Sequence, residues 1–173
     1  MKFDLEGAIE VLSMTPGTLK AMLGNLSDGW ISSSNSTDNW QAFDVVGHLI
    51  HGEETDWIPR ARIILEQGES RTFVPFDRFG QFENSIGKSL GDLLAEFEEA
   101  RARSLAELRS WNVSGEQFEL KGMHPELGEV SLSQLLATWV VHDLNHIRQI
   151  ATAMAKRYEA KVGPWKEYLS ILK

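Results

Sequence analysis

The apolar residues between positions 132 and 154 constrain the fold of this chain more than any other feature. They recur at the three- and four-residue spacing of a helix, and the same run contains His142 and His146. Residues four apart lie one above the other on one helix face. Because both histidines stand at the edge of the apolar side, we expect them to point into a packed interior or a cleft. Two imidazoles placed in this way can bind one metal ion together.

Three further stretches have helical periodicity. Residues 4–26 form a first helix, which the Thr15-Pro16 pair either kinks or divides into two pieces. Residues 40–67 form a second helix, which Pro59 breaks or kinks just after Ile58. Residues 90–111 form a third, with charged side chains such as Arg101 on a solvated face. A serine at position 131 or 133 begins the last long helix, which is expected to end near residue 158.

The connections between these helices are rich in glycine, proline and polar residues. We interpret residues 27–39, 69–88 and 112–129 as loops, with one short helix at 79–84 and a short closing helix at 165–172. No segment shows the alternation expected of a strand. The predicted fold class is therefore all-α, a four-helix bundle with long connecting loops and a short C-terminal helix, forming a single domain over residues 1–173.

Composition excludes several classes of function. The chain has 25 acidic and 17 basic side chains, a net charge of −8, and no basic stripe, so nucleic acid and anionic membrane are poor partners. There is no apolar run long enough to cross a bilayer and no signal peptide at the start, which predicts a cytoplasmic protein. The absence of cysteine rules out thiolate ligands and a cysteine nucleophile, so any thiol chemistry needs an external thiol.

A third metal ligand must come from elsewhere in the chain. The candidates are His48, His51 and His124, together with carboxylates such as Asp44, Glu53 and Glu54. Metal sites in helical bundles use inward side chains on facing helices, which favours the second helix over the loop that contains His124. Gly47, beside His48, would allow another helix or a substrate to approach closely.

The sequence resembles the DinB/YfiT-like superfamily in two motifs. WQAFDVVGH runs from Trp40 to His48, and HDLNHIRQI begins at His142. The resemblance implies a four-helix bundle, often dimeric, that holds a divalent metal through one histidine of the second helix and two of the last. Carried onto this chain, these ligands are His48, His142 and His146. Related proteins include transferases that use bacillithiol or mycothiol, and a maleylpyruvate isomerase that uses a thiol cofactor.

These observations predict a metal-dependent enzyme that adds a low-molecular-weight thiol to a small electrophile. The ion is expected to be zinc or nickel, with iron or copper as alternatives. The loop at 73–82 is expected to help form the pocket, with Arg78 available for an anionic group. Other hypotheses are a zinc-dependent hydrolase on the same three-histidine site, a metal-binding stress protein without turnover, and a metal-free interaction module. The expected partners are a small-molecule substrate and a second copy in a homodimer.

Several neighbouring residues receive weaker assignments. Asp143, Asn145 and Gln149 are expected at the surface or in contact with the metal-binding histidines, and Asp44 and Glu54 are candidates for accepting a histidine N–H. His51 is expected near the pocket mouth and His124 in a loop. Trp40 and Trp139 are the tryptophans nearest the proposed ligands and are expected to line the cavity. HDLNH also resembles a zincin motif, but Asp143 replaces its glutamate and no zincin sheet is expected.

Overall fold

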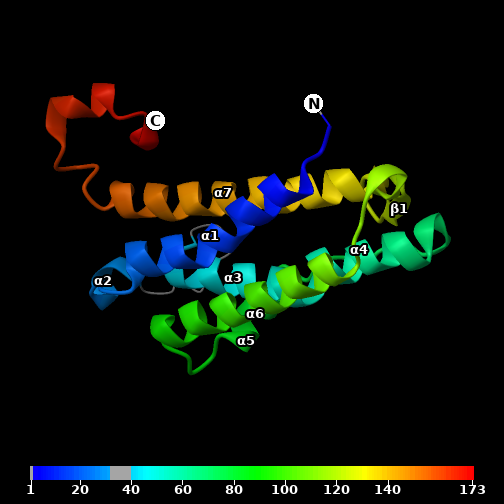
Figure 1. Cartoon of the computed structure of the whole chain (residues 1–173). Coiled ribbons are helices and arrows are strands. Elements are labelled where there is room, and N and C mark those ends of the chain that lie inside the picture. The colour runs from blue at the N-terminus through cyan, green and yellow to red at the C-terminus, as the bar shows by residue number, and fades with distance from the viewer. Residues whose placement is uncertain (1, 32–39) are drawn as a thin grey trace.

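A computed structural model describes residues 2–31 and 40–173 of the chain. Five long helices form it: α1 (Leu5–Leu23), α3 (Ala42–Thr55), α4 (Trp57–Glu66), α6 (Leu90–Ser110) and α7 (Leu132–Lys156). Figure 1 shows that α4 continues the direction of α3, so α1, α3–α4, α6 and α7 are the four members of a bundle. The predicted all-α four-helix bundle is confirmed.

Helix α1 passes through Pro16 as one continuous helix, so of the two expected alternatives the division into two pieces is wrong. Pro16 has no N–H, so the carbonyl of Leu12 one turn earlier loses its helical donor. The guanidinium of Arg101, on α6, donates to this carbonyl over 2.7 Å from Nη1 to O. A side chain from a neighbouring helix thus satisfies the backbone group that the proline leaves unpaired.

The second predicted helix breaks at Asp56, three residues before Pro59 and not after Ile58. Pro59 lies in the first turn of α4, where its missing N–H costs little. Its ring would clash with the carbonyl one turn earlier, at Thr55, and α3 ends at that residue. The start of α3 at Ala42, with Gln41 as its N-cap, lies two residues later than the predicted start.

Capping residues fix the start of the two longest helices. The Ser89 hydroxyl accepts from the Asp92 backbone N–H at the start of α6, and the Asp92 carboxylate accepts from the Ser89 backbone N–H. At α7 the Ser131 hydroxyl and the Gln134 side chain make the same reciprocal pair. Ser131 is therefore the cap of α7, and the helix ends at Lys156, two residues before the predicted end.

The connections contain more regular structure than expected. They hold α2 (Asp28–Ile31), η1 (Gly68–Ser70), α5 (Gly80–Asn84), η2 (Gly115–Glu119), η3 (Gly163–Tyr168) and η4 (Ser170–Leu172). The last two are 3₁₀ segments in place of the predicted closing α-helix. An antiparallel hairpin, β1 (Lys121–His124) with β2 (Gly128–Ser131), pairs Lys121 with Ser131 and His124 with Gly128, which corrects the expectation of no strands. Of the predicted loop at 27–39, residues 32–39 lie outside the described part.

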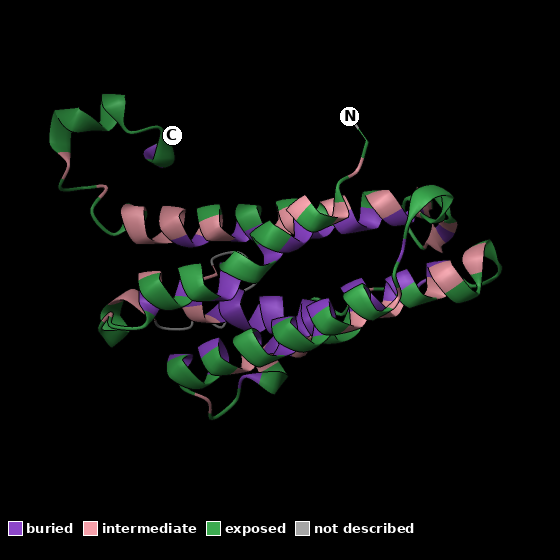
Figure 2. Ribbon diagram, in the orientation of Figure 1, coloured by how far each residue is buried: buried purple, intermediate pink, exposed green. Residues whose placement is uncertain are grey.

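The buried side chains form two clusters along the bundle axis. One cluster joins α1, α4, α6 and α7 around Trp57 and Trp139, and the other joins α1, α3, α6 and α7 around Phe97. Figure 2 shows the buried stripes of these helices turned toward one another. In the described ranges, no helix is long and apolar enough to cross a membrane. The candidate site lies on the α3–α7 side of this core.

Candidate metal centre

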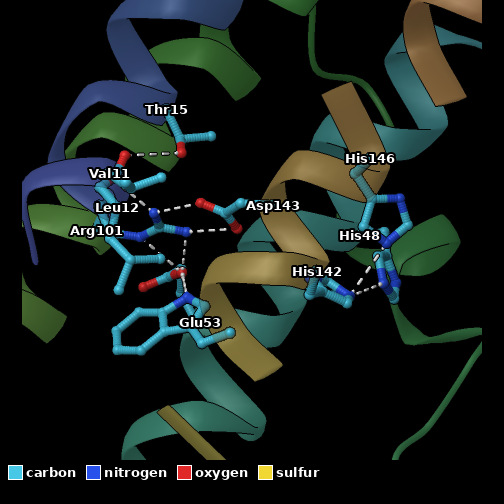
Figure 3. Close-up of polar contacts among 10 residues, drawn as sticks. Val11, Leu12, Thr15, His48, Glu53, Arg101, His142, Asp143 and His146 are labelled. Atoms are coloured by element: carbon cyan, nitrogen blue, oxygen red, sulfur yellow. Dashed lines mark hydrogen bonds and ion pairs between the residues drawn. The ribbon is translucent and has the colours of Figure 1, made fainter. Parts of the chain in front are cut away.

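Three histidine rings from two facing helices converge on one point. The Nε2 atom of His142 lies 3.1 Å from Nε2 of His48 and 3.1 Å from Nε2 of His146. His48 comes from α3, whereas the other two lie one turn apart on α7. One nitrogen from each ring can be chosen so that all three lie within 4.8 Å of one another. Figure 3 shows the three rings turned toward each other between α3 and α7.

Two glutamines set the orientation of two of these rings. His48 Nδ1 lies 3.3 Å from Gln81 Oε1, and His146 Nδ1 lies 2.7 Å from Gln149 Oε1. An amide oxygen only accepts, so each Nδ1 carries the proton and donates it. The proton-free Nε2 lone pairs of both rings then face His142. Gln149 contacts His146, one of the three candidate ligands, which is one of the two placements expected from the sequence.

Burial keeps the three imidazoles neutral. Burial, reinforced by the nearby His146, lowers the pKa of His48 to about 3. Burial and the neighbouring His146 and His48 rings lower the pKa of His142 to about 2. Burial also lowers the pKa of His146, although Gln149 and Asp143 oppose it. Neutral imidazole is the form that binds metal, so the rings need not lose a proton near pH 7.

The donor set fits a divalent ion. Two nitrogens bound to one zinc at 2.0–2.1 Å in a tetrahedral site are about 3.3–3.4 Å apart, close to the 3.1 Å found here. The proton-free Nε2 atoms of His48 and His146 both face Nε2 of His142. A single N–H on His142 can donate a well-aligned hydrogen bond to only one of them. A cation satisfies all three at once. Nδ1 of His142 is buried and has no hydrogen-bond partner in the described part of the chain.

His48 is buried because α3 is covered on both sides. A helical wheel places His48 away from the apolar stripe of this helix, yet it is only 8% exposed. Helix α5 covers that side and approaches closely because position 47 is glycine. A Cβ at Gly47 would lie 2.6 Å from Ser85 Oγ and 3.8 Å from Gln81 Cβ. The glycine therefore admits α5, which brings Gln81 to the His48 ring.

A cavity of about 610 Å³ opens beside the three histidines. Trp40 and Trp57 line it, together with Phe76, Arg78 and Phe79 from the predicted pocket loop. Trp139 is not among the lining residues. It is fully buried behind them, stacked on Trp57 with 5.8 Å between ring centroids. The cavity is large enough for a small-molecule substrate.

The other two histidines lie apart from the convergence point. His51 is buried on α3 with its ring 5.0 Å from that of Phe76, and neither ring nitrogen has a hydrogen-bond partner in the described residues. His51 is therefore not at the pocket mouth. His124 is in strand β1 and not in a loop, and it lines the cavity, as Arg60 does.

A buried ion network lies on the opposite side of α7 (Figure 3). Arg101 donates from Nη1 and Nη2 to Asp143 over 2.6 and 3.0 Å, and from Nε to Glu53 over 2.9 Å. The Trp139 indole N–H also donates to Glu53, over 3.1 Å. Arg101 is 2% exposed, which corrects the expectation that it belongs to a solvated face. Asp143 is fully buried, so it is neither at the surface nor a zincin base.

The two carboxylates predicted to accept a histidine N–H, Asp44 and Glu54, are placed differently. Asp44 accepts the Gln41 backbone N–H at the start of α3 over 2.9 Å. Glu54 is exposed, and so is Asn145 on α7. Gln81 and Trp57, which do contact the histidines, were not identified from the sequence. Gln81 lies in a segment without periodicity, and the only signal pointing to it was the glycine at position 47.

A family model for the DinB superfamily matches residues 12–150. The chain belongs to the DinB superfamily. A comparison with curated proteins found no match. Among solved structures, YfiT from Bacillus subtilis, described as "a probable metal-dependent hydrolase with an unusual four-helix bundle topology", is similar with a TM-score of 0.74. The two chains are 24% identical, and the match covers 88% of this chain and 86% of that one. This likeness supports the DinB bundle fold.

Proposed function

We propose that this DinB-family protein is a metal-dependent enzyme that activates a small nucleophile. His48, His142 and His146 would hold one divalent ion, with zinc or nickel as the first expectation and iron or copper as alternatives. The observation that carries the proposal is the convergence of three Nε2 atoms at a cavity of about 610 Å³. When bound, such an ion supplies Lewis acidity that lowers the pKa of water or a thiol.

The chain's own residues orient the site and shield it. Gln81 and Gln149 accept the Nδ1 protons of His48 and His146, so the Nε2 atom of each ring carries no proton and is available to the metal. The rings of Trp40 and Phe76 lie 4.8 and 5.3 Å from the His48 ring, and Trp57 lies 5.0 Å from His142. These aromatic rings limit the access of water, which strengthens electrostatic interactions within the site.

Transfer of an external thiol to a small electrophile is the first candidate reaction. The chain has no cysteine, so the thiol would be a low-molecular-weight co-substrate. Among the carboxylates lining the cavity, Asp56 is paired with Arg60 at 2.6 Å and Glu126 is exposed. Neither carboxylate is therefore placed as a general base beside His48, His142 and His146. A thiol is more acidic than water, so a thiol nucleophile depends less on a general base than water does.

Hydrolysis is the second candidate, and the description of YfiT as a probable metal-dependent hydrolase favours it. The same three histidines would serve, with water in place of the thiol. A metal-binding stress protein without turnover is the alternative outside enzymes. A cytoplasmic location, a homodimer and a small-molecule substrate remain predictions.

Metal content is the first test. The protein is purified without an affinity tag, and bound metal per chain is measured by mass spectrometry. We expect near one ion in the wild type, little in His48→Ala, His142→Ala and His146→Ala, and near one in the controls His51→Ala and His124→Ala. If His51→Ala empties the site while His48→Ala leaves it full, the assignment on α3 is wrong.

The reaction is tested on the loaded protein with two substrate sets. One set pairs electrophiles with several low-molecular-weight thiols, and the other contains esters and amides without any thiol. Conjugation that requires a thiol and disappears in His142→Ala supports the transferase. Cleavage without thiol supports the hydrolase, and neither activity with a filled site supports the stress protein.

A further inference from the structure

The cavity is lined by hydrogen-bond donors from strand β1, helix α4 and the loop at 73–82 that the proposed chemistry does not use. His124, Arg60 and Arg78 line it, and we call these three residues the donor cluster. We infer that the donor cluster binds a carboxylate of the substrate and so selects anionic small molecules. This inference rests on the proposed function, because it concerns the substrate of the same cavity.

The backbone of the hairpin turn fixes the protonation of His124. Nδ1 of His124 accepts the backbone N–H groups of Glu126 and Leu127, each over 3.1 Å. A nitrogen that accepts has no proton, so the neutral ring carries its proton on Nε2. Burial and the charge of Arg60 lower the pKa of His124, which keeps the ring in this neutral form. The ring therefore offers one N–H donor on its side away from the turn.

Arg60 provides a buried positive charge near that donor. Its guanidinium lies 5.4 Å from the centre of the Phe73 ring, and the His124 ring lies 6.2 Å from the same ring. Arg60 is 7% exposed, and its Nε pairs with Asp56 over 2.6 Å. The Arg60 guanidinium also donates from Nη2 to the Val74 carbonyl over 3.4 Å. It lines the same cavity as the His124 ring, and a planar guanidinium together with a ring N–H suits the two oxygens of a carboxylate.

Arg78 and Glu126 set the balance of charge at the opening. Both lie exposed at the rim of the cavity, so water and salt screen their charges. Their opposite charges offset each other. The buried Arg60 and the oriented His124 therefore carry most of the selection, and Arg78 adds to it.

Ligands of graded length test the inference on the zinc-loaded full-length protein. ω-Mercaptoalkanoates of three to six carbons are compared with ω-mercaptoalkanols of the same length by titration calorimetry. We expect the acids to bind more tightly, with a preference of about tenfold at the length that reaches the donor cluster. Equal affinity of acids and alcohols at every length would overturn the inference.

Variants show whether the donor cluster causes the preference. His124→Asn keeps an acceptor for the two turn N–H groups but removes the ring donor, and should reduce the preference about fivefold. Arg78→Gln should reduce it about twofold. Arg71→Gln is the matched control, because Arg71 is also exposed and lies outside the cavity lining. A preference unchanged in His124→Asn places the carboxylate elsewhere, such as on the metal, and refutes the assignment.

A second arm separates this inference from the proposed function. Hexanoate and hexanol are titrated into metal-free protein, and binding is followed by tryptophan fluorescence, since Trp40 and Trp57 line the cavity. A preference for hexanoate that falls in His124→Asn supports the donor cluster even if the metal hypothesis fails. No preference, or one that His124→Asn leaves unchanged, overturns it.

Discussion

Replacing Arg101 with methionine should destabilise the protein strongly, although the arginine is a charged residue on a long amphipathic helix. Arg101 makes two contacts with Asp143, one with the Leu12 carbonyl and a double contact with Glu53, all between 2.6 and 3.0 Å. The arginine is 2% exposed, and the side chains of both carboxylates are 1% exposed or less. Methionine fills similar space but leaves two buried carboxylates without a cation.

We expect Arg101→Met to reduce the free energy of unfolding by about 3–5 kcal/mol at pH 7. For a domain of this size, that loss lowers the melting temperature by about 10 °C. Urea unfolding followed by circular dichroism measures it. Lys20→Met is the control, because Lys20 makes an exposed ion pair with Glu98, and it should cost no more than about 1 kcal/mol.

Two further measurements identify the cause. Adding Glu53→Gln and Asp143→Asn to Arg101→Met should recover more than half of the loss, because no uncompensated charge remains. Burial already raises the pKa of Glu53, and removing Arg101 raises it further. The folded variant then binds protons more tightly than its unfolded chain, so its deficit should shrink from pH 7 to pH 5. A loss below about 1 kcal/mol in Arg101→Met, or no recovery in the triple variant, would refute the reasoning.

Two other predictions concern the histidines. Gly47→Ala should displace α5 together with Gln81, and should weaken metal binding about tenfold, measured by competition with a chelator. Gly17→Ala is the control, because a Cβ there meets nothing within 4 Å, and it should leave metal affinity unchanged. In metal-free folded protein, the pKa is about 3 for His48 and about 2 for His142, whereas in the unfolded chain both are near 6.5. As pH falls below about 6.5, the unfolded chain therefore binds protons at these two residues while the folded protein does not. The free energy of unfolding should therefore drop by about 4 kcal/mol between pH 7 and pH 5, and a flat urea midpoint over that range would contradict the burial of these rings.

The long helices were predictable because their apolar spacing and their caps agree. In α6 and α7, the buried residues follow the spacing seen in the sequence, and Ser131 begins α7 as a serine followed by Gln134 suggests. The convergence of His142 and His146 follows from their spacing on one helix. The placement of His48 needed the family resemblance, because the covering of its side by α5 depends on contacts between distant segments.

The errors arose where tertiary contacts override residue type. Position 101 falls on the apolar stripe of α6, four residues after Phe97 and four before Leu105, but arginine usually signals a solvated face. The carboxylates of Glu53 on α3 and Asp143 on α7 compensate the charge of the buried guanidinium. The hairpin strands contain four residues each, too few for an alternating pattern to be recognised in the sequence. The glycine at position 128, which adopts a φ of +74°, was the local indication of a turn.

The bond between Arg101 and the Leu12 carbonyl links a proline on one helix to an arginine on another. With alanine at position 16, the backbone N–H of that residue would donate to the Leu12 carbonyl. The Arg101 guanidinium would then compete for this acceptor and lose part of the interaction that stabilises it in its buried position. With Pro16 kept and Arg101 lost, a buried carbonyl has no donor. Positions 16 and 101 should therefore show epistasis, and among relatives proline at the first should accompany arginine at the second.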